Sequence, residues 1–490
     1  MNATTEIEQD QPIQASLDEV LSLLISILSD GIDHPEVWGE IPGFLEIWPD
    51  MPDLIEHRLQ SESDMTAQAL LILLKAVAQA EQGHIDTAFA AVEELAIKNS
   101  QSALVQGALF RLKAIREPDN PAYDLSGTFC SVPFRQLDVL ENSSHQCCAS
   151  WLNASAGNLQ TQPWREVWNS PTAKAIRASI HDGTYRYCNK STCPEIAGKT
   201  LQTKAEAREE SPRWAQIIDA EDTDLEEGPE TVNLAYDRTC NLACPSCRVS
   251  KYAADTKTRE RYATMQQDNI LPMLKNAKTV FVTGSGDPFA SKNFRTLMKD
   301  LTEEEYPELR FQIMTNAILL TPKQWAEFPT LHGRTRLMKV SIDAATGPTH
   351  EKLRLGAKWP IMMENMKFAG ELAARGEIDC YKLVFTVQQD NYLEMADAVD
   401  LAKQVGAQLI YFARITNWGT FTPAQFAHKA VFMPSHPEYR AFLKEMQDPR
   451  LLDPMVRLGD LGEFVGLNAD EGADEKAHGA TREKDILHVS

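Results

Sequence analysis

The spacing of apolar residues changes character along the chain. Between residues 16 and 116 apolar positions recur at helical spacing, which predicts an all-α region. The clearest stripe covers residues 69–80 and stops at Gly83, a second covers 88–95, and a third begins near Ser102. The first quarter of the chain is therefore expected to be a set of packed helices.

From Thr231 the pattern alternates between short apolar runs and amphipathic stretches, as in repeated βα units. The predicted strands are 231–236, 278–283, 310–315, 337–343, 381–387 and 408–413. The predicted helices between them are 259–276, 293–301, 322–328, 360–375 and 392–405. This regular order predicts a parallel sheet with right-handed crossovers, open or curved into a barrel. Six units fall short of an eight-fold barrel.

Between these two regions the sequence is richer in Pro, Gly, Trp and Cys, and then strongly acidic from Asp219 to Glu230. An acidic run that ends in Gly-Pro is typical of a solvated linker. The expected domains are helical residues 1–118, a small Cys-rich domain 119–200, an acidic linker 201–230, an α/β domain 231–465 and a polar tail 466–490.

Charge excludes some partners. The 490 residues carry 48 Lys and Arg against 70 Asp and Glu, a net charge of −22. Such a chain is poorly suited to bind nucleic acid or an anionic membrane, which both need positive surface. The first residues are polar and acidic, without the basic and apolar regions of an export signal. We therefore expect a cytoplasmic protein.

The cysteines are unevenly placed. None of the nine precedes Cys130, and eight lie between residues 130 and 247. In a reducing compartment, cysteines grouped in this way are more typical of metal ligands than of disulfides.

One group directly follows the first predicted strand of the α/β domain, as Cys240-Asn-Leu-Ala-Cys244-Pro-Ser-Cys247. Three thiolates in one loop leave one iron of a cubane iron–sulfur cluster without a protein ligand. A structural zinc site, the weaker alternative, normally uses four ligands. The loop stands at the carboxyl end of a strand, where α/β folds place their chemistry.

The following strands also end in polar or small residues. The second ends in Thr283-Gly-Ser-Gly-Asp-Pro288, a turn whose glycines let the backbone approach a ligand closely. Asn316 follows the third strand, and Ser341-Ile-Asp343 ends the fourth, with Arg354 shortly after. Packing alone does not account for polar residues at the end of each early strand.

Together, these motifs resemble the radical S-adenosylmethionine (radical SAM) superfamily over residues 231–420. The likeness rests on the Cys-x3-Cys-x2-Cys loop, the Gly-Asp-Pro turn and Ser-Ile-Asp. It implies a partial (β/α)6 barrel, in which Cys240, Cys244 and Cys247 hold a [4Fe–4S] cluster and SAM binds the fourth iron. The other residues that it implies in SAM binding are Gly284, Ser285, Gly286, Asp287, Asn316, Ser341, Asp343 and Arg354. It assigns no further catalytic residue.

The second group comprises Cys130, Cys147, Cys148, Cys188 and Cys193, with the elements Trp164-x3-Trp-Asn and Ile176-Arg between them. This region resembles the auxiliary-cluster domain called SPASM, or its shorter form, twitch, which usually follows the radical SAM domain and here precedes it. The resemblance implies a second [4Fe–4S] cluster on Cys130, Cys148, Cys188 and Cys193, with Cys147 as the alternative to Cys148. Zinc or buried thiols are the alternatives, and Cys380 reads as a buried thiol.

The leading hypothesis is a radical SAM enzyme that cleaves SAM to a 5′-deoxyadenosyl radical and takes a hydrogen from a peptide or protein. The N-terminal helices, which resemble a tetratricopeptide unit or form a plain bundle, would suit a polypeptide partner. Radical chemistry on a small molecule such as a sugar is the alternative, and a non-enzymatic iron–sulfur or zinc scaffold is the less favoured one. The expected electron donor is a flavodoxin or ferredoxin, which a basic island from Arg248 to Arg261 could dock.

Overall fold

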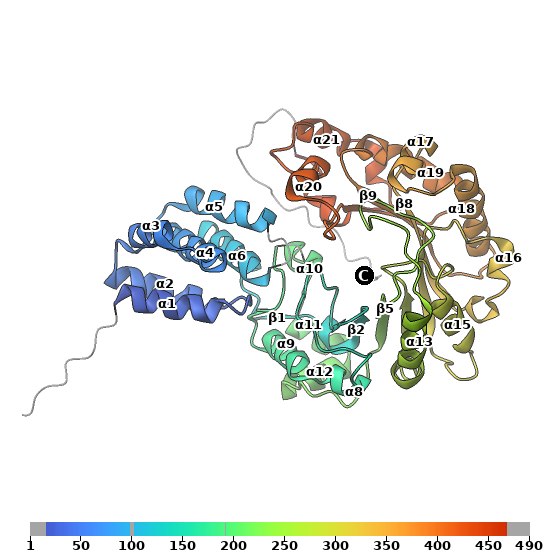
Figure 1. Cartoon of the computed structure of the whole chain (residues 1–490), viewed down its shortest axis with the longest axis horizontal. Coiled ribbons are helices and arrows are strands. Elements are labelled where there is room, and N and C mark those ends of the chain that lie inside the picture. Colours follow the sequence, from blue (N-terminus) through green and yellow to red (C-terminus); the bar gives the residue numbers. More distant parts are fainter. Residues whose placement is uncertain (1–15, 99–101, 192, 468–490) are drawn as a thin grey trace, which may run out of the picture. The chain divides into compact units, whose positions relative to one another are not determined.

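A computed structural model describes residues 16–98, 102–191 and 193–467, which form two compact units (Figure 1). Unit 1 takes in the described residues up to 131, together with 148–154 and 174–223. Unit 2 takes in 132–147, 155–173 and the described residues from 224 onward. The predicted polar tail lies outside the described residues, except for its first two positions.

Unit 1 begins with helices, as the apolar spacing predicts. They are α1 (Leu17–Leu28), α2 (Pro35–Ile47), α3 (Met51–Ser61), α4 (Met65–Glu81), α5 (Ile85–Lys98) and α6 (Ala103–Arg116). Polar caps fix several of their starts: Ser16 and Glu19 form a capping box, and the side chain of Asp64 accepts a hydrogen bond from the backbone of Ala67. The apolar stripes are buried between the helices, as at Leu74 and Val77. The all-α prediction is confirmed, and the tetratricopeptide likeness stays a prediction.

The rest of unit 1 consists of short elements. They are η1 (Pro121–Tyr123), β1 (Thr128–Phe129), most of α9 (Pro171–His181), α10 (Pro194–Ala197), β4 (Gln202–Thr203), α11 (Lys204–Glu210) and α12 (Pro212–Ala220). Strands β1 and β4 pair in antiparallel fashion. Residues 204–210 and 212–220, expected within a linker, are helical. Thr203 caps α11 with Glu206, and α12 buries Trp214.

A nine-stranded sheet forms the core of unit 2, in the order β11-β10-β9-β8-β7-β6-β5-β2-β3. Its strands are β2 (Gln136–Val139), β3 (Ser144–His145), β5 (Thr231–Leu234), β6 (Thr279–Val282), β7 (Arg310–Thr315), β8 (Thr335–Ile342), β9 (Tyr381–Val387), β10 (Leu409–Arg414) and β11 (Val456–Arg457). All neighbours are parallel except β2 and β3. The six predicted strands are β5 to β10, which confirms the α/β fold.

Helices connect these strands. They are α7 (Val132–Arg135), α8 (Trp164–Trp168), α13 (Thr256–Met265), the π-turn η2 (Gln266–Ile270), α14 (Leu271–Leu274), α15 (Lys292–Asp300), α16 (Pro322–Trp325), η3 (Pro329–Leu331), α17 (Gly347–Leu353), α18 (Trp359–Ala374), η4 (Tyr392–Glu394), α19 (Met395–Gln404), α20 (Pro423–Lys429), α21 (Tyr439–Glu445), η5 (Pro449–Leu452) and η6 (Gly459–Phe464). In Figure 1, α13, α15, α16, α18 and α19 follow one face of the sheet. The five predicted helices are present, and α17 was not predicted.

The two faces of this sheet differ in exposure. Side chains on the helix-covered face, such as Val282, Ile313 and Phe385, are fully buried. Their neighbours on the opposite, inner face, such as Met314 and Thr386, are only half-buried. Near the carboxyl ends of the strands the inner face is therefore open, unlike the packed interior of a closed eight-stranded barrel.

Candidate functional site

The first site of interest is the loop after β5, which carries Cys240, Cys244 and Cys247. Backbone hydrogen bonds fold it on itself and anchor it, from Cys247 to Cys244 (2.9 Å) and from Cys240 to Tyr252 (2.9 Å). A further one runs from the amide of Ala243 to the carbonyl of Leu355 (3.0 Å). The loop is thus positioned by segments on both of its sides.

A cavity of about 180 Å³ opens beside this loop, at the carboxyl ends of β5 to β10. Its lining comprises Cys240, Leu242, Cys244, Ser246, Cys247, Arg248, Thr283, Gly284, Ser285, Gly286, Met314, Thr315, Asn316, Ser341, Asp343, Arg354, Thr386, Ile415, Thr416 and Trp418. All three predicted cluster cysteines are among them. So are seven of the eight residues predicted to contact SAM.

The eighth, Asp287, does not line the cavity. Its fully buried carboxylate accepts hydrogen bonds from the Thr315 hydroxyl (2.7 Å) and the Asn316 amide (2.9 Å). Its own amide donates to the carbonyl of Thr239 (2.9 Å). Asp287 therefore joins the glycine-rich turn to the end of β7 and to the cysteine loop, from behind the cavity wall.

Gly286 and Gly284 serve different purposes in that turn. A Cβ at Gly286 would meet the carbonyl oxygens of Asp237 and Thr239 at 2.6 Å, so only glycine lets these backbones pack. A Cβ at Gly284 would meet nothing within 4 Å. Close packing explains Gly286, whereas Gly284 lies beside open space.

Two polar residues of the fourth βα unit meet in the cavity. The Arg354 guanidinium lies 3.0 Å from a carboxylate oxygen of Asp343, and both side chains are buried. Burial lowers the pKa of Arg354, but the charges of Asp343 and Cys244 outweigh it and raise that pKa overall. The nitrogen that makes this contact is Nε.

Arg248, predicted within an electron-donor docking island, is instead buried in the cysteine loop. Its guanidinium donates to the carbonyl of Arg238 (2.6 Å) and to that of Ser285, and lies 3.4 Å from the Cys247 sulfur. This buried cation is the main site residue that sequence reasoning assigned elsewhere. Thr283, Met314 and Thr386 were missed as cavity residues, although their strand-end positions were a usable signal.

The donor set fits an iron–sulfur cluster. Burial raises the pKa of Cys240 and raises that of Cys244 to about 11, so both are neutral thiols unless a metal displaces the proton. Among the described residues, no three Cys, His, Asp or Glu side chains are placed to bind one metal ion. A cubane takes each thiolate at a separate iron, and the polar cavity adjoins the same three sulfurs.

The second cysteine group lies in unit 1. Cys130, Cys148, Cys188 and Cys193 all belong to it, whereas Cys147 falls in unit 2. Burial raises the pKa of Cys188 well above its usual value, and the charges of Cys193 and Cys130 add to that rise. Burial likewise raises the pKa of Cys193, with a contribution from Cys148. These pairwise influences link Cys188 to Cys130 and Cys193, and Cys193 to Cys148.

A buried ion pair supports this set from the helices of unit 1. Lys190, two residues after Cys188, contacts the carboxylate of Asp33, and both side chains are almost fully buried. Asp33 also accepts a hydrogen bond from the Trp38 indole (2.7 Å). A Cβ at Gly107 would meet Asp33 at 2.1 Å. The segment that carries Cys188 is therefore fastened to α2 and α6.

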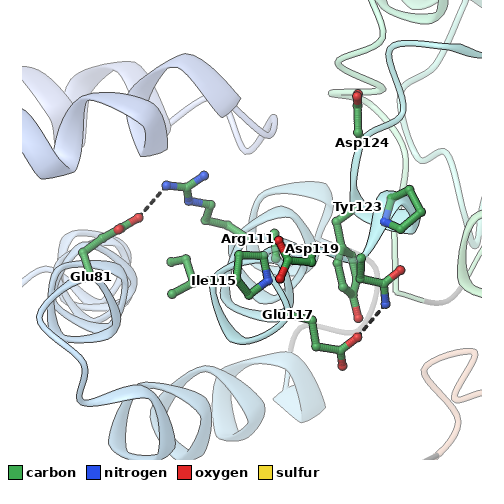
Figure 2. Close-up of a pocket in the computed structure, with 11 residues that line it drawn as sticks. Glu81, Arg111, Ile115, Glu117, Asp119, Tyr123 and Asp124 are labelled. Atoms are coloured by element: carbon green, nitrogen blue, oxygen red, sulfur yellow. Dashed lines mark hydrogen bonds and ion pairs between the residues drawn. The ribbon is translucent and has the colours of Figure 1, made fainter. Parts of the chain in front are cut away.

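A second, wider cavity of about 530 Å³ lies in unit 1, between α4, α6 and the segment after α6 (Figure 2). Arg111 and Glu81 form an ion pair across one side of it (2.5 Å), and Tyr123 lies on the opposite side. None of the site residues predicted from the sequence lines this cavity.

Comparison with known families agrees with both groups. Residues 237–402 match the radical SAM superfamily. Residues 130–194 match the iron–sulfur cluster-binding domain called SPASM. The chain carries a radical SAM domain preceded by a SPASM domain. These domains imply an enzyme that uses a [4Fe–4S] cluster with SAM and an auxiliary iron–sulfur cluster.

None of the curated proteins matches this chain. Several solved structures resemble part of it. The chain has 13% identity to SuiB of Streptococcus suis bound to precursor peptide SuiA, with a TM-score of 0.30, over 51% of this chain and 55% of that one. It has 16% identity to anSMEcpe with bound AdoMet and Kp18Cys peptide, with a TM-score of 0.31, over 44% and 58%. The chain thus spans a little over half the length of these proteins.

No helix in the described part of the chain is both long and apolar enough to cross a membrane. The cytoplasmic location stays a prediction.

Proposed function

We propose that this chain is a radical SAM enzyme that abstracts a hydrogen atom from a peptide or protein. When bound, the cluster and SAM supply a 5′-deoxyadenosyl radical by one-electron reductive cleavage of SAM. The chain itself must position SAM, hold the substrate and exclude water.

The observation that carries this proposal is the composition of one cavity. Three cysteines of one loop and seven polar or glycine residues from three further βα units line the same 180 Å³ space. Their meeting is accounted for if a cluster and a polar cofactor bind side by side.

The residues have distinct proposed roles. The backbone of Gly284 to Gly286 would bind the amino group of SAM, and Ser341 and Arg354 would bind its carboxylate. Asn316 and Asp343 would contact the ribose or the carboxylate, and the backbone near Ile415 would face the adenine. Asp287 acts as a positioning residue for Asn316, because it holds that residue's amide and does not reach the cavity.

Cys130, Cys148, Cys188 and Cys193 are proposed to bind the auxiliary [4Fe–4S] cluster. All four belong to unit 1 and interact electrostatically. Four thiolates would leave no iron open, so this cluster would not bind SAM.

The peptide or protein substrate is the less constrained part of the proposal. An open inner sheet face leaves room beside the cavity, and SPASM relatives often modify polypeptides. SuiB and anSMEcpe were each solved with a peptide bound. A flavodoxin or ferredoxin is proposed to supply the electron. The basic island proposed to dock it includes Lys257 on α13 and excludes Arg248, which is buried.

Anaerobic reconstitution tests the proposed function. We expect about eight irons per chain, as two cubane clusters require, and 5′-deoxyadenosine when SAM and dithionite are added. Zinc in place of iron, or intact SAM after reduction of the loaded protein, would contradict the proposal.

A further inference from the structure

The inner face of the sheet carries two lysines one level below the 180 Å³ cavity in which SAM is proposed to bind. Lys339 on β8 lies directly opposite Lys382 on β9 in the strand register. Two residues further along β8, Ser341 lines the cavity, so Lys339 faces the same side one level deeper. Met314, the register partner of Lys339 on β7, also lines the cavity.

Both lysines are buried and lack an anionic partner among the described residues. Lys339 is 7% exposed and Lys382 is 9% exposed. The Lys339 ammonium lies 4.5 Å from the centre of the Phe281 ring, and that of Lys382 lies 5.6 Å from the Tyr411 ring. Aromatic faces attract cations, but they do not neutralise them.

This arrangement is costly in the absence of a ligand. Burial, with the charge of Lys382 adding to it, lowers the pKa of Lys339 to about 7. Burial also lowers the pKa of Lys382, helped by Arg457 and opposed only by the Cys380 thiol. Buried charges are normally paired or lose their charge by a pKa shift, so an anion from outside the chain would let both ammonium groups stay charged.

The neighbouring groups suit an organic ligand. The buried Oε1 of Gln312, on the same inner face, has no hydrogen-bond partner. It could accept an N–H from the ligand. Phe281 and Tyr411 add apolar surface on either side of the lysine pair. The level below the cavity thus offers two cations, an acceptor and two rings.

We propose that Lys339 and Lys382 bind a carboxylate of the substrate on the inner face of the sheet, one level below the cavity. This proposal rests on the proposed function, in which the substrate binds along the inner face of the sheet. Strands β8 and β9 are neighbours about 4.8 Å apart, so the two lysines leave the sheet side by side, and a carboxylate has one oxygen for each ammonium. On a polypeptide, that carboxylate belongs to an Asp or Glu side chain or to the chain terminus.

Matched ligand pairs test the proposal on the reconstituted full-length protein with SAM bound. N-acetyl-glutamate amide and N-acetyl-glutamine amide differ only in the side-chain charge, and N-acetyl-alanine and its amide differ only at the terminus. Titration followed by NMR gives the affinities. We expect one acidic probe to bind at least tenfold more tightly than its neutral partner.

Lys339→Met and Lys382→Met should each abolish this discrimination, because the ammonium that recognises the charge is gone. Lys299→Met, an exposed lysine on α15 that pairs with Glu327, should leave it intact. Each buried variant should also be at least as heat-stable as the unmodified protein without ligand, since an uncompensated buried charge is removed.

Equal affinity for acidic and neutral probes, or discrimination that survives in both buried variants, would overturn the proposal. Tighter binding of inorganic phosphate than of either acidic probe would overturn the carboxylate assignment. These binding measurements do not require SAM cleavage. A failure to form 5′-deoxyadenosine would therefore count against the proposed function alone.

Discussion

The two cysteine groups are built in opposite ways. The first draws three cysteines from eight consecutive residues and places them beside an open polar cavity. The second gathers four cysteines from more than sixty residues of sequence and fastens one of them to a buried ion pair. A site that must admit a cofactor and a reactant needs space, whereas a closed cluster needs only a rigid cage.

Removal of the first group should have the largest effect. We expect Cys240→Ala, Cys244→Ala and Cys247→Ala, combined in one variant, to abolish 5′-deoxyadenosine formation, because no iron remains to bind SAM. Iron analysis should still find about four atoms per chain. An iron content near zero would show that the two groups do not load independently.

Disruption of the second cysteine group is expected to lower the iron content and to leave SAM cleavage intact. Cys188→Ala removes one of four interacting thiols and should lower the iron content by about half. Cys147→Ala and Cys380→Ala are the matched controls and should keep full iron. If Cys147→Ala lost iron and Cys148→Ala did not, the assignment of the fourth ligand would have to be exchanged.

The ion pair behind the second group can be broken from the helical side. Asp33→Asn leaves the Lys190 ammonium buried without a countercharge and should destabilise the protein by about 3 kcal/mol in thermal unfolding. The double variant Asp33→Asn with Lys190→Met should recover part of that loss. Additive losses would mean that the pair does not act as a unit.

Next to the first cysteine group, stability depends on close backbone packing rather than on a buried ion pair. Gly286→Ala forces a Cβ against two carbonyl oxygens and should cost about 2 kcal/mol of unfolding free energy. Gly284→Ala meets open space and serves as the control for stability in the same denaturant titration. Equal losses at both positions would contradict the close approach at Gly286.

A smaller effect is expected where the Cys-rich sequence joins the large sheet. Burial raises the pKa of Asp138 on β2 from 3.8 to about 6. The folded protein therefore holds this proton more tightly than the unfolded chain, and stability falls as the pH rises from about 4 to 6. Asp138→Asn should remove that dependence and gain about 1 kcal/mol at pH 7, less than the full shift implies because the amide loses an acceptor oxygen. Unchanged pH dependence in this variant would contradict the raised pKa.

Local patterns predicted much of the fold. Strands β7 and β9 match the expected ranges at both ends, because apolar runs and breaking residues mark them clearly. Helix α11 lies in a stretch that was interpreted as a linker, although the capping pair Thr203 and Glu206 was legible. The small strand β2 could not be assigned, since its residues pair with residues of β5 that lie 95 positions away and the choice depends on tertiary packing.

The site residues were likewise predictable where local patterns marked them and not where tertiary contacts decide their surroundings. Strand ends and cysteine spacing pointed to the cavity, because in a parallel sheet those positions meet at one edge. Asp287 and Arg248 were assigned to the wrong surroundings, since sequence does not say whether a polar residue faces a cavity or supports its wall. The contact of Asp33 with Lys190 joins positions 157 residues apart and left no local trace.

The route of the chain has a consequence for any attempt to take the enzyme apart. The backbone passes between the two units after residues 131, 147, 154, 173 and 223. No single cut yields two contiguous fragments that each contain one unit. Exchange of either unit for that of another protein would therefore have to preserve all five junctions.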